Sequence, residues 1–324
     1  FKQKTAYDIS LGLVGSEMCI RDRKEIVASG GPAIALDFLK CLDITKSLGM
    51  ISEGTNAWLK LCTTASRIHH HCSVATNTHR CAHRKPNLGA TKSDPEFRKL
   101  FQASPGQIMV GADLSGIELR MLAHYLGRWS SEFGDTLLTG DIHQVNADKI
   151  GITRKLVKNV TYAFLYGAGD LKIGLTYDKL LSPKRAKAKG KEIRQAYIDA
   201  IDGLGSLLDA VKKASERGYV KAIDGRKVIV DSTHKALNYC LQAGAGCVAK
   251  MWMIENYKTI KETNLPAHQL AFIHDELQFE CPKEHVEDLR TSLVYSATRA
   301  GEIYKMRVRI DAEAVAGNNW AETH

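Results

Sequence analysis

Hydrophobic and polar positions follow a helical period near the start of the chain. Ile34, Phe38 and Leu42 recur every four residues, so the pattern predicts that residues 24–58 are mostly helical. Residues 77–95 are polar, basic and interrupted by proline, and they predict a long surface loop.

The clearest change of period begins at Gln107. Residues 107–113 form an apolar run that ends in a carboxylate, and from Ser115 onward the apolar positions recur with a helical period. This pattern predicts a strand, a turn and a helix in succession. Residues 141–217 and 233–261 carry further helical patterns.

Two hairpins are predicted in the last third of the chain. Asp224-Gly225 lies between strand-like stretches of residues 219–230 and is the two-residue signal for a primed turn. Apolar residues 269–273 and alternating residues 276–280 flank the pair His274-Asp275. A polar pair therefore lies at the bend of a tight hairpin.

Composition adds a preference for an anionic partner. The chain has 324 residues, enough for two packed units or one core with a large insertion. Its net charge of +9 and pI near 9.0 favour nucleic acid or an anionic surface, and basic residues are concentrated in residues 149–194. Since no apolar run reaches about 18 residues, we expect no membrane-spanning helix. The 8 scattered cysteines predict reduced thiols and no structural disulfide.

Two carboxylates are candidates for metal chemistry. Asp113 ends an apolar strand and Asp275 lies at the turn of an apolar hairpin. Two strands of one sheet would bring these anions close together, an arrangement that divalent cations such as Mg²⁺ stabilise. The alternative is that each aspartate only caps a turn.

A cationic helix face accompanies these carboxylates. Arg154, Lys158 and Tyr162 are spaced four residues apart after Thr153, so they project from one face of a helix. An arginine and a lysine one turn apart can clamp a triphosphate, and the tyrosine can stack on a base or a sugar. The alternative is a solvated basic face without a ligand.

Three ordered motifs resemble those of family A DNA polymerases, and closely resemble the replicative polymerases of podophages. They are Asp113-Leu-Ser-Gly-Ile-Glu118-Leu-Arg, Arg154-x-x-x-Lys158-x-x-x-Tyr162 and His274-Asp275-Glu276. Shorter segments outside these motifs also resemble the family and occur in the same order: Glu53-Gly-Thr-Asn-Ala-Trp58, Pro86-Asn-Leu, Gly140-Asp-Ile-His143, Phe164-Leu-Tyr-Gly-Ala-Gly169, Asp224-Gly-Arg-Lys227 and Asn238-x-x-x-Gln242. The resemblance extends from about residue 51 to the end of the chain.

The resemblance implies an α+β fold, a right-hand polymerase core with an antiparallel β palm, helical fingers and a partial helical thumb. It implies the following boundaries: a partial thumb with connecting loops in residues 24–103, the palm in 104–139 and 218–324, and the fingers in 140–217. Residues 1–23 resemble translated sequencing-adaptor sequence instead, and we expect them to be non-native.

For the metal site, the resemblance implies that Asp113, Asp275 and the backbone carbonyl of Leu114 ligate two Mg²⁺ ions, with Mn²⁺ as a substitute. One ion would lower the pKa of the primer 3′-hydroxyl, and the other would bind the triphosphate and the leaving pyrophosphate. Lys158 would protonate the pyrophosphate.

For the incoming dNTP, the resemblance implies that Arg154, Lys158 and His143 hold the phosphates. Glu118 would lie under the sugar and disfavour a ribose 2′-hydroxyl. Tyr162 would share that pocket, as in polymerases that tolerate dideoxynucleotides.

For primer-template DNA, the resemblance implies that Arg80, Asn238 and Gln242 read acceptors in the minor groove that are common to all correct base pairs. His274 and Glu276 would lie near the primer terminus. The partners would then be primer-template DNA and dNTPs, in the cytoplasm of a phage-infected bacterium.

Two departures from the family pattern concern Ala163 and His79, where the family usually has glycine. The resemblance implies that the methyl group of Ala163 would narrow the room near the templating base, and that His79 would alter the loop that carries Arg80. We also expect a C-terminal fragment, without the 3′–5′ exonuclease domain, most of the thumb or a site for a processivity factor.

Three other interpretations stay open at this point. A single-subunit RNA polymerase shares the two aspartates and the lysine-tyrosine helix, although Glu118 and Glu276 favour the deoxynucleotide enzyme. An inactive DNA-binding remnant is the second. The third is a zinc module built from Cys62, His69, His70, His71, Cys72, His79, Cys81 and His83, whose spacing matches no paired cysteine motif.

Overall fold

The computed structural model describes residues 33–324, which fall into two compact units. The first unit comprises residues 33–71 and 83–87, and the second comprises residues 72–82 and 88–324. The segment expected to be adaptor-derived, residues 1–23, lies outside the described residues.

Helix dominates the start of the first unit, as its apolar spacing predicts. The elements are α3 (Ala33–Leu48), a π-helical turn η1 (Gly49–Glu53) and α4 (Trp58–Leu61). Two short strands, β1 (His71–Ser73) and β2 (Ala82–Arg84), form a two-stranded sheet, and only His71, His83 and Arg84 of these strands belong to the first unit.

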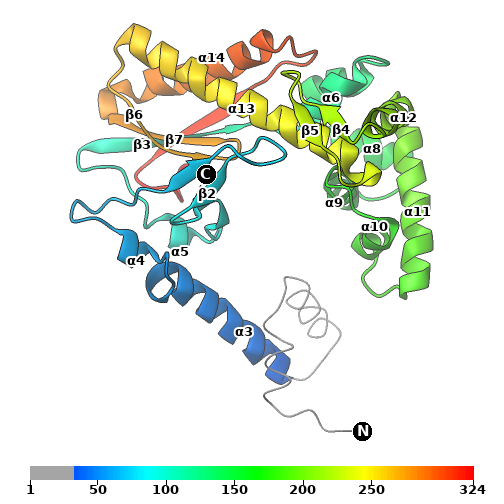
Figure 1. Cartoon of the computed structure of the whole chain (residues 1–324), viewed down its shortest axis with the longest axis horizontal. Coiled ribbons are helices and arrows are strands. Elements are labelled where there is room, and N and C mark those ends of the chain that lie inside the picture. The colour runs from blue at the N-terminus through cyan, green and yellow to red at the C-terminus, as the bar shows by residue number, and fades with distance from the viewer. Residues whose placement is uncertain (1–32) are drawn as a thin grey trace. The chain divides into compact units, whose positions relative to one another are not determined.

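A four-stranded antiparallel sheet organises the second unit. Its strands are β3 (Gln107–Leu114), β6 (His268–Ile273), β7 (Glu276–Pro282) and β8 (Ala312–Gly317), in the order β6-β7-β3-β8. Helices α13 (Ala236–Thr263) and α14 (Val286–Ile303) lie side by side along this sheet (Figure 1). The predicted strand at Gln107 and the hairpin around His274-Asp275 are both confirmed.

Strand β7 shows how the sheet buries both of its faces. Leu277, Phe279 and Cys281 belong to the apolar core that includes α13 and α14. The intervening polar residues, Glu276 and Gln278 among them, are buried as well, at 6% and 3% exposure. Apolar side chains therefore alternate along β7 with buried polar side chains, and both faces of the strand are covered.

The helical region that we predict between residues 141 and 217 is confirmed, and its helices group together in Figure 1. The helices from the end of β3 onward are α6 (Ile117–Leu126), α7 (Glu132–Thr139), α8 (Ile142–Ile150), α9 (Arg154–Leu165), α10 (Asp170–Tyr177), α11 (Pro183–Ala200) and α12 (Leu204–Ser215). Helices α10 and α11 approach closely because Gly174 and Gly190 lie at their contact. A Cβ atom at Gly190 would lie 1.8 Å from the carbonyl oxygen of Asp170.

Two predictions of local structure need correction. The hairpin of β4 (Tyr219–Lys221) and β5 (Lys227–Ile229) has no two-residue primed turn. Ala222 N–H donates to the carbonyl of Arg226, so the loop has three residues and ends at Gly225, with φ of +85°. The predicted loop of residues 77–95 also contains β2 and a 3₁₀ turn, η2 (Leu88–Ala90).

No helix within residues 33–324 combines the length and the apolar character that crossing a bilayer requires.

Candidate active site

The fold brings together the two carboxylates that the sequence separates by half of the chain. Asp113 pairs with Glu276 in the register of β3 and β7, and Asp275 directly precedes Glu276. The N–H of Leu114 donates to the carbonyl oxygen of Asp275 at 3.1 Å. Both aspartates therefore lie at one end of the central strand pair.

Burial and neighbouring negative charges raise the pKa of both carboxyl groups. Desolvation, followed by repulsion from Asp275, Glu276 and Glu118, raises the pKa of Asp113 to about 7, although its side chain reaches solvent. Desolvation and Glu118 raise the pKa of Asp275 to about 6, against an opposing effect of Arg80. A cation bound here would relieve this repulsion.

Glu118 joins the carboxylate pair to two other elements. From the first turn of α6, its Oε1 accepts hydrogen bonds from Arg80 Nη2 at 2.9 Å and from the Tyr166 hydroxyl at 3.1 Å. Both side chains of the Arg80–Glu118 ion pair are largely buried. Burial and Glu118 raise the pKa of Tyr166 to about 12, so this hydroxyl remains a donor at neutral pH.

Helix α9 presents the predicted cationic face. Its N-cap is Thr153, whose hydroxyl accepts from the N–H of Leu156, and Val157 and Val160 are buried on its inner side. Arg154 and Lys158 are exposed on the opposite side.

Tyr162 connects that helix to the carboxylates. It is partly buried on α9, and its pKa is raised by desolvation and by the charges of Glu118 and Asp275. Its ring centroid lies 6.2 Å from that of His143. The helix that carries the two cations is thus next to the carboxylate pair.

His143 and Asp141 form the adjacent end of α8. Asp141 caps the helix by accepting from the N–H groups of His143 and Gln144, while its second oxygen pairs with Arg154 Nε at 2.5 Å. His143 is buried, and its Nδ1 has no hydrogen-bond partner within the described residues. Burial lowers the pKa of His143, with smaller contributions from Arg154 and Lys158 and against an opposing effect of Asp141.

Asn238 and Gln242 lie one turn apart on α13, and both are half-buried. The amide of Asn238 donates to the carbonyl of Leu165 at 2.9 Å, which ties α13 to the end of α9. His274 has a φ of +59° in the two-residue turn between β6 and β7. A non-glycine residue rarely adopts this conformation, and such outliers cluster at functional sites.

Glu276 is held by residues from the end of the chain. Its carboxylate accepts from Trp320 Nε1 at 2.5 Å and from Gln278 Nε2 at 2.7 Å, and it pairs with His324 at 3.0 Å. The hydroxyl of Thr323 donates to Gln278. This network supports the strand position opposite Asp113.

The sequence motifs contained several of these residues without indicating their roles. Tyr166 lies one turn beyond Tyr162, so helical spacing was the available signal for it. Asp141 directly precedes α8, so the preference of aspartate for the N-cap position was the available signal there. No local signal marked Trp320 or His324.

The structure offers no support for the zinc module. Across residues 33–324, no group of three or more histidine, cysteine, aspartate or glutamate side chains could hold a metal ion. The thiols of Cys72 and Cys81 instead contact each other through a hydrogen bond.

An antiparallel sheet with paired carboxylates beside a cationic helix is the arrangement expected of a family A polymerase core. The sequence profile of DNA polymerase family A matches residues 38–322. The DNA-directed DNA polymerases of Enterobacteria phage T3 and Escherichia phage T7 are each 31% identical to this chain, across 90% of it and 46% of their own length. The chain belongs to DNA polymerase family A, and it spans about half the length of these phage relatives.

A solved structure matches the fold. The polymerase domain of Pol1 from M. smegmatis, in complex with DNA primer-template and dNTP, superposes with a TM-score of 0.78 at 23% identity. The match covers 99% of this chain and 58% of that one. The predicted α+β polymerase fold is therefore confirmed.

Proposed function

We propose that this chain catalyses template-directed DNA synthesis, transferring nucleotides from dNTPs to a primer 3′-hydroxyl with release of pyrophosphate, in phage replication in the bacterial cytoplasm. The observation that carries the proposal is the pair Asp113 and Asp275 at adjacent strand ends, with both pKa values raised. The names of the T3 and T7 relatives agree with it.

The donor set at the carboxylate pair suits Mg²⁺, with Mn²⁺ as a substitute. The oxygens of Asp113, Asp275 and the Leu114 carbonyl are hard donors, and Mg²⁺ sites commonly use one or two carboxylates completed by substrate phosphates and water. When bound, two such ions supply a lowered pKa for the primer hydroxyl and neutralise charge on the phosphates.

The cations of α9 would hold the triphosphate. Arg154 offers a planar fork to phosphate oxygens and Lys158 a mobile point charge, which is also a proton source for pyrophosphate. The exposed Arg154–Asp141 pair is weak, so its exchange for a phosphate costs little. The buried, unpartnered Nδ1 of His143 offers a further donor.

Glu118 and Tyr162 would contact the sugar and exclude a ribose 2′-hydroxyl. In this proposal Arg80, Asn238 and Gln242 face the minor groove of the primer-template, while His274 and Glu276 lie near the primer terminus. The Arg80–Glu118 ion pair supports a link between the sugar site and the minor-groove reader.

The test is extension of a labelled primer on a longer template at low salt with dNTPs and Mg²⁺. We expect extension by the native chain, none by Asp275→Asn, and native extension by Asp209→Asn, which changes an exposed aspartate of α12. Native-like extension by Asp275→Asn would refute the metal assignment. Extension with NTPs in place of dNTPs would indicate an RNA polymerase. Binding of primer-template without extension would indicate an inactive DNA-binding remnant.

A further inference from the structure

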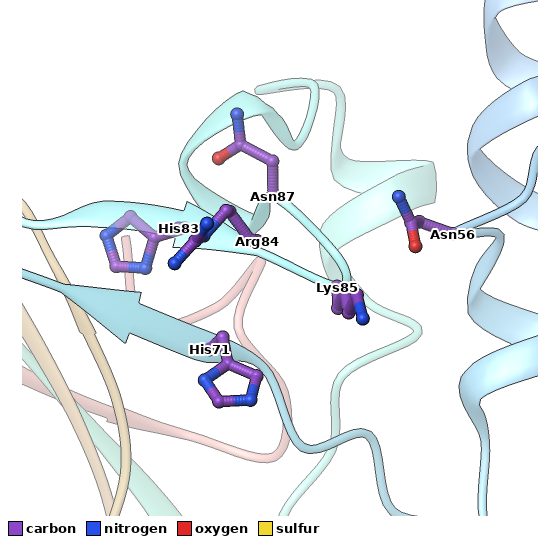
Figure 2. A pocket seen from close by; sticks show the side chains of 6 residues that line it. All are labelled: Asn56, His71, His83, Arg84, Lys85 and Asn87. Atoms are coloured by element: carbon purple, nitrogen blue, oxygen red, sulfur yellow. The ribbon is translucent and has the colours of Figure 1, made fainter.

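A polar cavity in the first unit has no part in the proposed reaction. Its volume is about 400 Å³. The lining residues are Asn56, His71, His83, Arg84, Lys85 and Asn87. Figure 2 shows residues 83–85 and 87 following one another along one stretch of chain, with His71 on the neighbouring strand.

The lining has the chemistry of an anion site. None of the six residues is acidic, while Arg84 and Lys85 contribute two positive charges. The two asparagines offer amide N–H groups, and the imidazole of His83 is only 6% exposed, so it is fixed by its surroundings. Arg84 offers a guanidinium fork and Lys85 an ammonium group, and each of these groups suits the oxygens of a phosphoryl group.

The backbone at Lys85 is also unusual. This residue has a φ of +55°, in the left-handed region that side chains other than glycine, asparagine and aspartate rarely occupy. Its side chain is exposed, so burial of the lysine does not explain the conformation. Such outliers cluster at ligand-binding sites.

We propose that this cavity binds a phosphoryl anion. A water molecule takes up about 30 Å³ in the liquid, so the cavity accommodates a phosphate together with water. The backbone of the primer-template is one source of this group, and free phosphate or pyrophosphate is the other. Binding of the DNA backbone at this cavity rests on the proposed function, whereas binding of a free anion is inferred from the cavity alone.

The test compares the native chain with a double variant, Arg84→Gln with Lys85→Gln. The matched control is Lys212→Gln with Lys213→Gln, which removes the same charge from exposed positions of α12. In the first arm, inorganic phosphate is added at constant ionic strength, with chloride as the reference. We expect phosphate to raise the Tm of the native chain and of the control, and to have at most half that effect on the cavity variant.

The second arm measures binding of labelled primer-template by fluorescence anisotropy between 50 and 200 mM salt. Each lost phosphate contact reduces the slope of log K against log salt by about 0.9, so we expect a slope smaller by about 1–2 in the cavity variant than in the control. A change in both arms supports the site with DNA as its source. A change in the first arm alone supports the site with a free anion as its ligand.

Unchanged behaviour of the cavity variant in both arms would overturn the proposal. Circular dichroism and the Tm in chloride establish that the variant is folded, and Arg84→Lys, which keeps the charge, is a milder second variant that should retain most of the phosphate effect. Failure of the proposed function is separable, because it would appear as absent primer extension by the native chain while the phosphate shift persists.

Discussion

The raised pKa of Asp113 predicts that the carboxylate pair destabilises the metal-free protein. A carboxyl group whose pKa is higher in the folded state than in the unfolded chain contributes stability that is complete below the unfolded pKa and is lost as the pH rises through the folded value. For Asp113 that window runs from 3.8 to about 7. Asp113→Asn removes this titration, so the variant should be more stable than the native chain in EDTA at neutral pH.

The size of the effect follows from the shift and from the exposure of the side chain. A rise from 3.8 to about 7, at about 1.4 kcal/mol per pKa unit, sets an upper limit of about 4 kcal/mol. Because Asp113 reaches solvent, screening reduces this value, and we expect about 1–2 kcal/mol. For a protein of this size that corresponds to a Tm higher by about 2–6 °C.

The assay is thermal unfolding in EDTA at pH 5, 6, 7 and 8. The stability gain of Asp113→Asn over the native chain should grow from pH 5 to 7 and remain constant above, whereas Asp209→Asn on α12 should show no such trend. Adding Mg²⁺ at pH 8 should stabilise the native chain more than Asp113→Asn. A variant that is no more stable than the native chain at pH 8 in EDTA would refute the electrostatic reasoning.

Three further predictions concern the nucleotide site and the helices behind it. Lys158→Ala should lower kcat/KM for dNTP by about 10–100-fold, measured by single-nucleotide incorporation. Lys172→Ala, at an exposed site on α10, should leave kcat/KM unchanged, and equal losses in the two variants would contradict a phosphate role for Lys158. Glu118→Ala should reduce discrimination against NTPs at least about tenfold, and an unchanged ratio of dNTP to NTP efficiency would exclude it from sugar selection. Gly190→Ala should destabilise the protein by about 2–3 kcal/mol in denaturant unfolding, because its Cβ would meet the carbonyl oxygen of Asp170. Gly169→Ala should change stability little, since no atom lies within 4 Å of its Cβ. Similar effects of the two variants would show that the contact between α10 and α11 is not tight.

The elements that carry the site were predictable because their signals are local. The apolar run before Asp113, the alternation after Asp275 and the spacing of Arg154, Lys158 and Tyr162 each lie within a few residues, where strand and helix geometry repeats. The roles proposed for these residues rest on the resemblance of the motifs.

Contacts between distant segments were decided only by the tertiary structure. Alternation of polar and apolar residues, as in β7, is typical of a strand with one face in solvent. Glu276 is nevertheless buried, and it accepts a hydrogen bond from Trp320, which lies 44 positions away in the sequence. The raised pKa of Asp113 likewise depends on desolvation and on carboxylates from the β6–β7 turn, β7 and α6. Periodicity records which side of an element is apolar. It carries no information about which partner covers a polar side, because hydrogen bonding and charge repulsion depend on distances that folding alone creates.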